Sequence, residues 1–549
     1  MAQVIERRAQ MFPTLSAAQL ERLSKLGTRQ AFEQGQVVIE QGDRCPNFYV
    51  VLQGAMEVVQ PDDGKELPVT VHRRGEFTGE TNMLSGRRSL VRTRMSEPGE
   101  LLVVTPAALR RVVQFDSDLS ELFMRAFILR RVALIASAHG DAVLIGSSHS
   151  SATLRIREFL IRNGQPHSYL DVDKDESVQD LFDRFGVRAE DVPVVICRYD
   201  KVLKSPSNEE VAECLGFNAA VDESTVRDLV VVGAGPAGLA AAVYGASEGL
   251  NVLVLESSAP GGQAGSSSKI ENYLGFPTGI SGQALAGRAF TQAQKFGAEV
   301  NVGRSARRLH CDERPYRVEL AGGGVVKTRA VVLATGAQYR KLALADLPRF
   351  EGVGVYYAAT PVEGQICSGS EVVVVGGGNS AGQAAVYLAG LAAHVHVLVR
   401  GPGVAATMSR YLIQRIEDSN NVTLRPFSEI TELHGDGHLE QVRIRDAKTG
   451  DSALKPLRHL FLMTGASPNT SWLDGCVALD DKGFVKAGPD LSPDELGSWP
   501  LKRSPFLLET NLPGVFAVGD VRSTSVKRVA SAVGEGSICI QLVHRFLAE

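Results

Sequence analysis

Apolar positions follow a strand-like pattern in the first part of the chain. Short β-branched runs at 36–40 and 48–52 are separated by glycine turns, which predicts a small antiparallel barrel or jelly roll within residues 1–138. Apolar residues at helical spacing predict flanking helices at 16–26 and 118–138. This part is therefore expected to be a mainly β domain between helices.

The pattern changes to alternating strands and helices over residues 140–218. Buried apolar runs predict strands, and amphipathic segments between them predict helices. The expected order is strand 141–145, helix 151–163, strand 169–173, helix 178–185 and strand 192–196, the last opened by Val-Pro. This βαβαβ order predicts a compact α/β domain.

Residues 224–549 contain two units in which a strand, a glycine turn, a helix and a second strand follow one another. The first unit has strands 228–232 and 251–255 around helix 239–248. The second has strands 371–375 and 394–399. Two such units predict two Rossmann-like domains, each able to hold a dinucleotide.

The first glycine turn carries the sequence Gly233-Ala-Gly235-Pro236-Ala237-Gly238, and Glu256 ends the following strand. Glycines permit a tight turn and a close approach of a pyrophosphate, whose charge the helix N-terminus favours. The carboxylate can bind ribose hydroxyls. We expect a dinucleotide here.

The second turn reads Gly376-Gly-Gly378-Asn379-Ser380-Ala381, but Arg400 stands where the first unit has its acid. An arginine at that place suits a 2′-phosphate, so NADPH is expected rather than NADH. The alternative is a surface arginine with no ligand. Two turns in one chain suggest one prosthetic and one exchangeable dinucleotide.

Composition narrows the class of protein. The chain has 549 residues, of which 44% are hydrophobic and 22% charged, which excludes a disordered chain. The net charge of −4 gives no electrostatic argument for nucleic acid or a membrane surface. Neither an 18-residue apolar run nor an apolar signal core is apparent, so we expect a cytoplasmic protein.

The seven cysteines include no CxxC pair and no metal-ligand cluster. An odd count at such spacings predicts unpaired, mostly structural thiols in a reducing compartment and no metal site. Cys367, near the second glycine turn, is expected to be a buried structural thiol.

The first domain resembles the cyclic nucleotide-binding domain family. The resemblance rests on Phe32-x-x-Gly35, Gln41-Gly42-Asp43, Gly79-Glu80 and Arg88-Ser89. It implies that backbone near Gly79 and Arg88 hold a phosphate, with Ser89 beside them, and that Glu80 accepts from a ribose hydroxyl. Cyclic AMP or another cyclic nucleotide would then be an effector. The alternative is a degenerate domain kept for packing or dimerisation; without a recognition helix, no DNA binding is expected.

The second domain is similar to thioredoxin and glutaredoxin folds. Pro193 stands at that family's cis-proline position, but the turn that carries CxxC in the family reads Ser147-Ser-His-Ser-Ser151. The resemblance implies the fold without its disulfide chemistry, and hence a structural adaptor or a relay between neighbours.

The third part resembles low-molecular-weight thioredoxin reductases through 261–263, 270–272, 334–336, 518–520 and 527–530. That implies non-covalent FAD, with an FAD domain at 224–341 and 476–549 and an inserted NAD(P)H domain at 342–475. Asp520 is expected at the ribityl or phosphate region, and the last helix points at the flavin ring. The implied FAD residues are Gly233, Gly235, Pro236, Ala237, Gly238, Glu256, Gly262, Gln263, Asn272, Ala334, Thr335, Gly336, Gly519, Asp520, Arg528, Val529 and Ala530. The implied NAD(P)H residues are Gly376, Gly378, Asn379, Ser380, Ala381, Arg400, Arg410 and Gly465.

One departure from this family bears on function. Its members carry Cys-Ala-Thr-Cys just before the second turn, whereas here Ala358 and Pro361 flank Ala359-Thr360. We expect an FAD-dependent NAD(P)H oxidoreductase, regulated by cyclic nucleotide, that passes electrons to an external acceptor without a redox dithiol or a catalytic side chain. The acceptor could be a ferredoxin- or flavodoxin-like protein, a quinone or oxygen.

Two other functions stay open. One is a cyclic-nucleotide and redox sensor with slow turnover, and the other is a thioredoxin-disulfide reductase that uses non-standard thiols. The two resemblances to dimeric families predict a homodimer.

Overall fold

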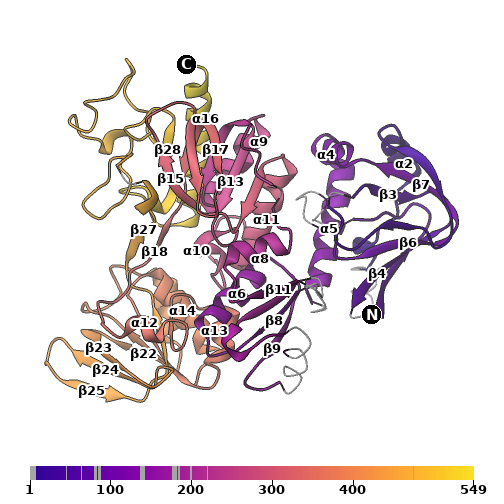
Figure 1. Cartoon of the computed structure of the whole chain (residues 1–549). Coiled ribbons are helices and arrows are strands. Elements are labelled where there is room, and N and C mark those ends of the chain that lie inside the picture. The colour runs from indigo at the N-terminus through magenta and orange to yellow at the C-terminus, as the bar shows by residue number, and fades with distance from the viewer. Residues whose placement is uncertain are drawn as a thin grey trace.

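The computed structural model of the chain describes residues 8–44, 46–62, 65–79, 83, 88–136, 142–175, 182, 186–197, 201–218, 220–473 and 475–549. In Figure 1 the N-terminal domain lies to one side, and the remaining parts of the chain lie together. None of the described helices is long and apolar enough to cross a membrane.

The N-terminal domain consists of two antiparallel sheets with helices beside them. One sheet has the order β1 (Thr28–Phe32), β7 (Gly99–Val104), β3 (Phe48–Val51), and the other β2 (Val37–Ile39), β6 (Arg92–Glu97), β4 (Ala55–Asp62), β5 (Lys65–His72). Helices α2 (Ala17–Ser24), α4 (Pro106–Phe115) and α5 (Ser117–Ala136) flank them. Apolar rings of the sheet and α5, such as Phe48 and Phe123, share a buried core. The predicted jelly roll is confirmed.

Residues 142–218, called the middle domain below, form a four-stranded sheet of order β11-β10-β8-β9. Its elements are β8 (Ala142–Gly146), α6 (Ser151–Arg162), β9 (Ser168–Asp171), a short helix at Ala189–Asp191, β10 (Val194–Cys197), β11 (Lys201–Lys204) and α8 (Asn208–Cys214). β8 and β9 are parallel, and the other pairs are antiparallel. The Val192–Pro193 bond is cis. Apart from Phe182, the predicted helix at 178–185 lies outside the described residues.

Residues 220–473 and 475–549 contain two larger sheets, called the first sheet and the second sheet below. The first sheet has the order β14-β13-β12-β17-β16-β15, with β28 beside β17. Its strands are β12 (Val226–Val232), β13 (Val252–Glu256), β14 (Glu299–Val302), β15 (Ala306–His310), β16 (Tyr316–Leu320), β17 (Val325–Leu333) and β28 (Val515–Ala517). Helices α9 (Pro236–Ser247), α10 (Gly262–Gly265), α11 (Gly282–Lys295) and α16 (Val529–Leu547) belong to this part, and short helices lie at Gly488–Asp490 and Gly519–Val521. The last four residues of β12 and of β17 are buried, where the two strands pair in parallel at the centre of the sheet.

The second sheet has the order β19-β26-β20-β21-β22 and is parallel throughout. Its strands are β19 (Val355–Tyr356), β20 (Glu371–Val375), β21 (His394–Leu398), β22 (Val422–Arg425) and β26 (His459–Leu462). A separate antiparallel sheet comprises β23 (Ser428–His434), β24 (Gln441–Asp446) and β25 (Ser452–Lys455). The helices are α12 (Leu347–Phe350), α13 (Pro361–Ile366), α14 (Asn379–Ala389), α15 (Arg410–Glu417) and a short one at Ser471–Leu473.

Two extended segments connect the first and second sheets. β18 (Ala337–Tyr339) leaves the first sheet and pairs antiparallel with β27 (Ala466–Pro468), which returns from the second. Beside them, Thr335 and Asn469 exchange two hydrogen bonds of 2.8 and 2.9 Å. The second sheet is thus inserted between β17 and β28 of the first sheet.

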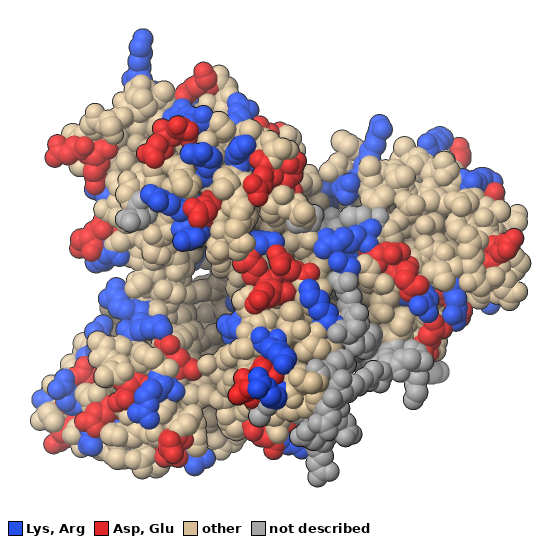
Figure 2. Space-filling view, in the orientation of Figure 1, with Lys and Arg blue, Asp and Glu red and all other residues tan. Residues whose placement is uncertain are grey.

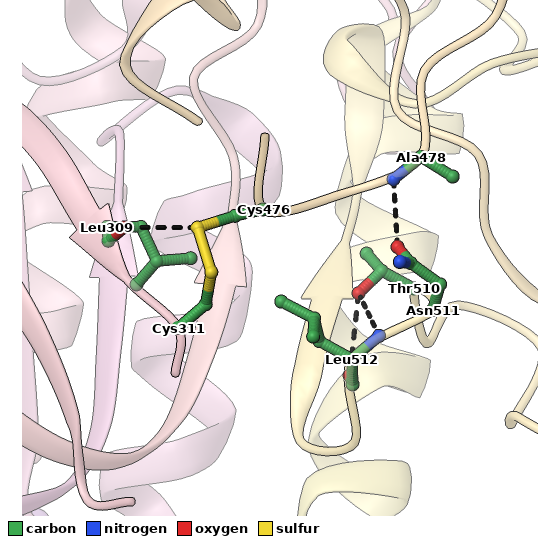
Figure 3. The surroundings of a disulfide bond; sticks show 7 residues. All are labelled: Leu309, Cys311, Cys476, Ala478, Thr510, Asn511 and Leu512. Atoms are coloured by element: carbon green, nitrogen blue, oxygen red, sulfur yellow. Dashed lines mark hydrogen bonds between the residues drawn. A yellow bond between two sulfur atoms is a disulfide. The ribbon is translucent and has the colours of Figure 1, made fainter. Parts of the chain in front are cut away.

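The expectation of unpaired cysteines is wrong for four of the seven. Cys197 is bonded to Cys214, and Cys311 to Cys476 (Figure 3). The partners are 17 and 165 residues apart in sequence, so the fold brings them together and local spacing gives no sign of the pairing. Cys367 and Cys539 are free and buried, and Cys45 lies outside the described residues.

Candidate functional site

The first glycine turn is closely packed at two of its glycines and open at the third. A Cβ on Gly233, whose φ is +104°, would lie 2.3 Å from the carbonyl oxygen of Ala334, and one on Gly238 would lie 1.9 Å from that of Gly233. No atom outside the turn lies within 4 Å of the place where Gly235 would carry a Cβ. Gly235 caps α9 without a side-chain hydrogen bond, so this helix N-terminus can receive an anion.

Glu256 closes one side of this turn from the end of β13. It is 7% exposed, and its two carboxylate oxygens accept from the backbone N–H groups of Ala234 at 2.7 Å and Ser258 at 2.8 Å. Burial raises the pKa of Glu256, while these hydrogen bonds and the guanidinium of Arg162 act in the opposite direction. The carboxylate is therefore fixed beside the turn, as a ribose ligand must be.

A second loop lies against the first. The N–H of Gly261 donates to the carbonyl of Ala234 at 2.7 Å, and Gln263 Nε2 donates to the carbonyl of Ala337 at 2.5 Å. Ala334, Thr335 and Gly336 directly follow β17, and the backbone of Ala334 and Thr335 lies against Gly233. The structure therefore brings the predicted residues of segments 233–238, 256–263 and 334–336 together. Asn272 lies in an exposed loop.

The last predicted FAD residues lie between β28 and α16. The N–H of Gly519 donates to Glu535 at 2.7 Å, and Lys527 Nζ donates to the carbonyl of Asp520 at 2.6 Å. Burial raises the pKa of Asp520, and Lys527 opposes this. Arg528 caps α16 without a side-chain hydrogen bond, so the N–H groups that follow, from Val529 and Ala530 onward, are open. With its open turn, fixed carboxylate and uncapped helices, this set fits a dinucleotide such as FAD.

The second glycine turn has the same form but a more open setting. A Cβ on Gly376 would lie 2.4 Å from the carbonyl oxygen of Met463, whereas Gly378 has nothing within 4 Å. Asn379 Oδ1 accepts from the N–H of Ser409 at 2.7 Å. Arg400 and Arg410 are exposed. Ala381 is buried under the turn, and Gly465 is exposed at the return to the first sheet.

Tyr339 lies between the two turns and was missed by sequence reasoning. It stands in β18, its side chain interacts with Ser380 of the second turn, and the charge of Asp520 acts on it from the first site. Burial is the main reason that its pKa is raised. Figure 2 shows a hollow between the two lobes that carry the first and second sheets. The sequence signal was weak, because a single tyrosine after an Ala-Thr-Gly segment belongs to no motif that we recognised.

The place of the family's dithiol is filled by a helix start. Thr360 caps α13, whose first residue is Pro361, and Thr360 Oγ1 accepts from the N–H of Val362 at 3.2 Å. Cys367, at the end of α13, is fully buried, and burial raises its pKa to about 11. Its thiol therefore stays protonated at neutral pH and is a poor nucleophile.

A cavity of about 390 Å³ lies in the N-terminal domain between β4, β5 and α5. Its wall is mostly apolar and includes Gly79 and Ser89, together with Arg130 and His72, which we had not singled out. Arg88 is not among the lining residues. Its side chain lies against Gly216 of the middle domain, where a Cβ would meet Arg88 Nε at 2.4 Å. Glu80 lies outside the described residues.

Comparison with known proteins agrees with this geometry. The profile of the pyridine nucleotide-disulphide oxidoreductase family matches residues 227–536, and that of the cyclic nucleotide-binding domain matches 29–116. Thioredoxin reductase of Bacillus subtilis is 32% identical over 330 residues, which are 60% of this chain and 97% of that protein. Thioredoxin reductase of Mycolicibacterium smegmatis is 32% identical over 326 residues, 59% of this chain and 98% of that protein.

Solved structures agree as well. The crystal structure of Lactococcus lactis thioredoxin reductase, in the FR conformation, matches with a TM-score of 0.53 and 27% identity, over 59% of this chain and 99% of that one. The crystal structure of T. acidophilum thioredoxin reductase matches with a TM-score of 0.52 and 29% identity, over 59% and 99%. The chain belongs to the pyridine nucleotide-disulphide oxidoreductase family, as a thioredoxin reductase-like flavoprotein oxidoreductase that carries a cyclic nucleotide-binding domain at its N-terminus.

Proposed function

We propose that this protein oxidises NADPH through FAD and delivers the electrons to an external acceptor without a redox dithiol, under control of a nucleotide in its N-terminal domain. The observation that carries the proposal is the start of α13, where Ala358 and Pro361 take the places of the family's two cysteines. A bound FAD would supply the two-electron chemistry. The chain itself binds and orients the two nucleotides.

Four of the seven cysteines are poorly placed for disulfide exchange. Cys197, Cys367 and Cys539 have no exposed surface, and Cys214 is 4% exposed. Burial raises the pKa of Cys539 as it does that of Cys367. An attacking thiol must be ionised and accessible, and these cysteines do not meet that requirement.

The second glycine turn favours NADPH in this proposal. Arg400 follows the strand β21 that lies next to β20 and its turn, and Arg410 begins α15. Both side chains are exposed, so a 2′-phosphate could reach them without displacing other groups. A guanidinium binds phosphate through paired hydrogen bonds.

Control by the N-terminal domain is supported by its contacts with the middle domain. Arg44 Nη1 donates to the carbonyl of Asn218 at 2.8 Å, and Arg88 packs on Gly216. Asn218 in turn exchanges hydrogen bonds of 2.7 and 2.8 Å with the backbone of Val302, which is the register partner of Glu256. A phosphate that drew Arg88 toward the cavity would act on this contact, and a ligand shifts activity only through such a difference between states.

We also infer that the middle domain is a thioredoxin-like domain that has lost its dithiol. Its four-stranded mixed sheet, with Pro193 just before the central strand β10, supports this. It would serve as an adaptor, in an assembly that we propose to be a homodimer.

An anaerobic titration of the purified protein tests the proposal. NADPH and NADH are added separately, with and without cyclic AMP, while the visible flavin band is recorded. We expect NADPH to bleach the band, faster than NADH does, and cyclic AMP to change the rate. A colourless protein, or a flavin that neither nucleotide reduces, would contradict the oxidoreductase; reduction without turnover on any acceptor would favour the sensor.

Reduction of thioredoxin by non-standard thiols is the second candidate, because the structure holds two cysteine pairs. Cys311 is the partly exposed member of the second pair. NADPH-driven reduction of thioredoxin that is lost in a Cys311→Ser, Cys476→Ser double variant would establish this candidate. No reduction of thioredoxin by the wild type would exclude it.

A Cys367→Ser variant tests whether the free thiol near the second glycine turn takes part in turnover. Cys367→Ser should leave NADPH-driven turnover within about twofold of wild type, because a buried protonated thiol takes no part in it. Steady-state oxidation of NADPH with an artificial acceptor measures this. A loss greater than about tenfold, or roughly 1.4 kcal/mol, would show that Cys367 is needed.

A further inference from the structure

We propose that Arg162, at the end of α6 in the middle domain, is a positioning residue of the FAD site. The inference rests on the proposed function, because it assumes that the first glycine turn holds FAD. The matched family segment begins at residue 227, so Arg162 lies outside it. The middle domain would thus contribute to a site that is otherwise built from the reductase part of the chain.

The contact between α6 and the FAD loop is made by several hydrogen bonds. Arg162 Nη2 donates to the carbonyl of Gly262 at 2.7 Å, and Asn163 Nδ2 donates to that of Ser258 at 3.1 Å. From the other side, Gln283 Nε2 donates to the carbonyl of Ile161 at 3.0 Å. The end of α6 therefore holds the loop between Glu256 and Gln263 at two points of its backbone.

The guanidinium is well shielded from water. The Arg162 side chain is 16% exposed, and its other terminal nitrogen lies 3.3 Å from Glu158 one helical turn earlier. Hydrogen bonds from a charged donor are roughly twice as strong as neutral ones, and shielding strengthens them further. Gly262 is thus held by a strong, directed contact.

Arg162 also acts on the charge of Glu256. Its positive charge lowers the pKa of a carboxyl that burial raises. The other basic residue nearby, Arg304 at the end of β14, directs its guanidinium to Glu209 and Glu213 on α8. An ionised carboxylate only accepts hydrogen bonds, so the lone pairs of Glu256 that the two backbone N–H groups leave free can accept from ribose hydroxyls. Arg162 therefore favours the form of Glu256 that binds the adenosine half of FAD.

The test measures FAD affinity, with no turnover involved. FAD is removed from the full-length protein, and its dissociation constant is measured by flavin fluorescence between pH 5 and 9 for wild type, Arg162→Met and Arg162→Lys. Arg157→Met is the matched control, because Arg157 lies on the same helix with its guanidinium 4.7 Å above the Tyr169 ring. Circular dichroism confirms that each variant is folded.

We expect Arg162→Met to weaken FAD binding at least tenfold at the acidic end of this range and less at the alkaline end, because loss of the positive charge disfavours the ionised form of Glu256. Arg162→Lys should recover most of the affinity, and Arg157→Met should stay within twofold. In a Glu256→Gln background the pH dependence should vanish. Wild-type affinity in Arg162→Met, or a loss that is equal at all pH values and not recovered by lysine, would overturn the proposal.

Failure of the proposed function gives a different result. A wild-type protein that binds no FAD at any pH would contradict the function itself. If Arg162→Met does not fold, Arg162→Gln and Arg162→Lys, which keep polar donors, give the same comparison of pH profiles. If the ratio of their FAD affinities did not change with pH, the inference would also be overturned.

Discussion

The two glycine turns have the same sequence pattern, but their surroundings differ. The first is enclosed by the 256–263 loop, by 334–336, by Glu256 and, through Arg162, by another domain. The second is bordered by exposed Arg400 and Arg410. Enclosure slows the loss of a ligand, whereas an open rim permits exchange. The difference supports the proposal that the prosthetic dinucleotide occupies the first turn and the exchangeable one the second.

The largest expected effect is that of Gly235→Ala. The new methyl group would occupy the space beside the turn, where no atom lies within 4 Å, so the protein should fold but a pyrophosphate could not approach. We expect FAD affinity to fall by about 100-fold, or roughly 2.7 kcal/mol. Flavin absorbance of the purified protein measures this, and a fully yellow Gly235→Ala protein would break the assignment of the first turn.

Gly378→Ala makes the same change in the second turn, where the space is equally open. Here we expect the flavin to be retained and the KM for NADPH to rise about tenfold, which is roughly 1.4 kcal/mol of binding energy. Flavin content and steady-state kinetics distinguish the two glycines. If Gly378→Ala lost its flavin as Gly235→Ala does, the two turns would not have separate roles.

Arg400→Ala should have a smaller and more selective effect. Because the side chain is exposed, solvent screens its charge, and we expect a rise of about fivefold in the KM for NADPH, near 1 kcal/mol. The KM for NADH should not change, since NADH has no 2′-phosphate. Equal effects on both nucleotides, or none, would support the alternative of a surface arginine.

The smallest expected effect is a change in the pH dependence of stability, caused by His459 in the second sheet. Burial lowers the pKa of His459, at the start of β26, from 6.5 to about 4. Between these values the unfolded chain binds a proton that the folded chain does not, so the free energy of unfolding falls as pH drops from 6.5 toward 4. In His459→Gln the melting temperature should decline less over this range, by a few degrees; identical declines would show that His459 contributes nothing.

Local patterns were enough to predict most of the fold and part of the site. Strands such as β12 and β20 are apolar runs followed at once by glycine turns, so periodicity and turn chemistry identify them. The predicted FAD residues around Gly233 and Glu256 converge because strand ends meet at one edge of a parallel sheet.

What could not be predicted depends on contacts between distant segments. The partners in Cys311–Cys476 are 165 residues apart, and Arg162 reaches Gly262 from another domain. The direction of Arg88 is a third case, since its sequence context suggested a phosphate, whereas its side chain packs on Gly216. Nothing in a local pattern encodes which remote backbone a side chain will meet.

The bond between Cys311 and Cys476 gives the reductase an unusual covalent connectivity. Together with the intervening chain it forms a macrocycle that contains all of the second sheet, from β19 to β26. A protease that cuts once within this ring leaves both products in a single molecule, which separates only after a reductant opens the disulfide. The lobe that carries the second sheet can thus be nicked without being lost, and the return segment at Ala478, held by Asn511 at 2.8 Å (Figure 3), would stay in place.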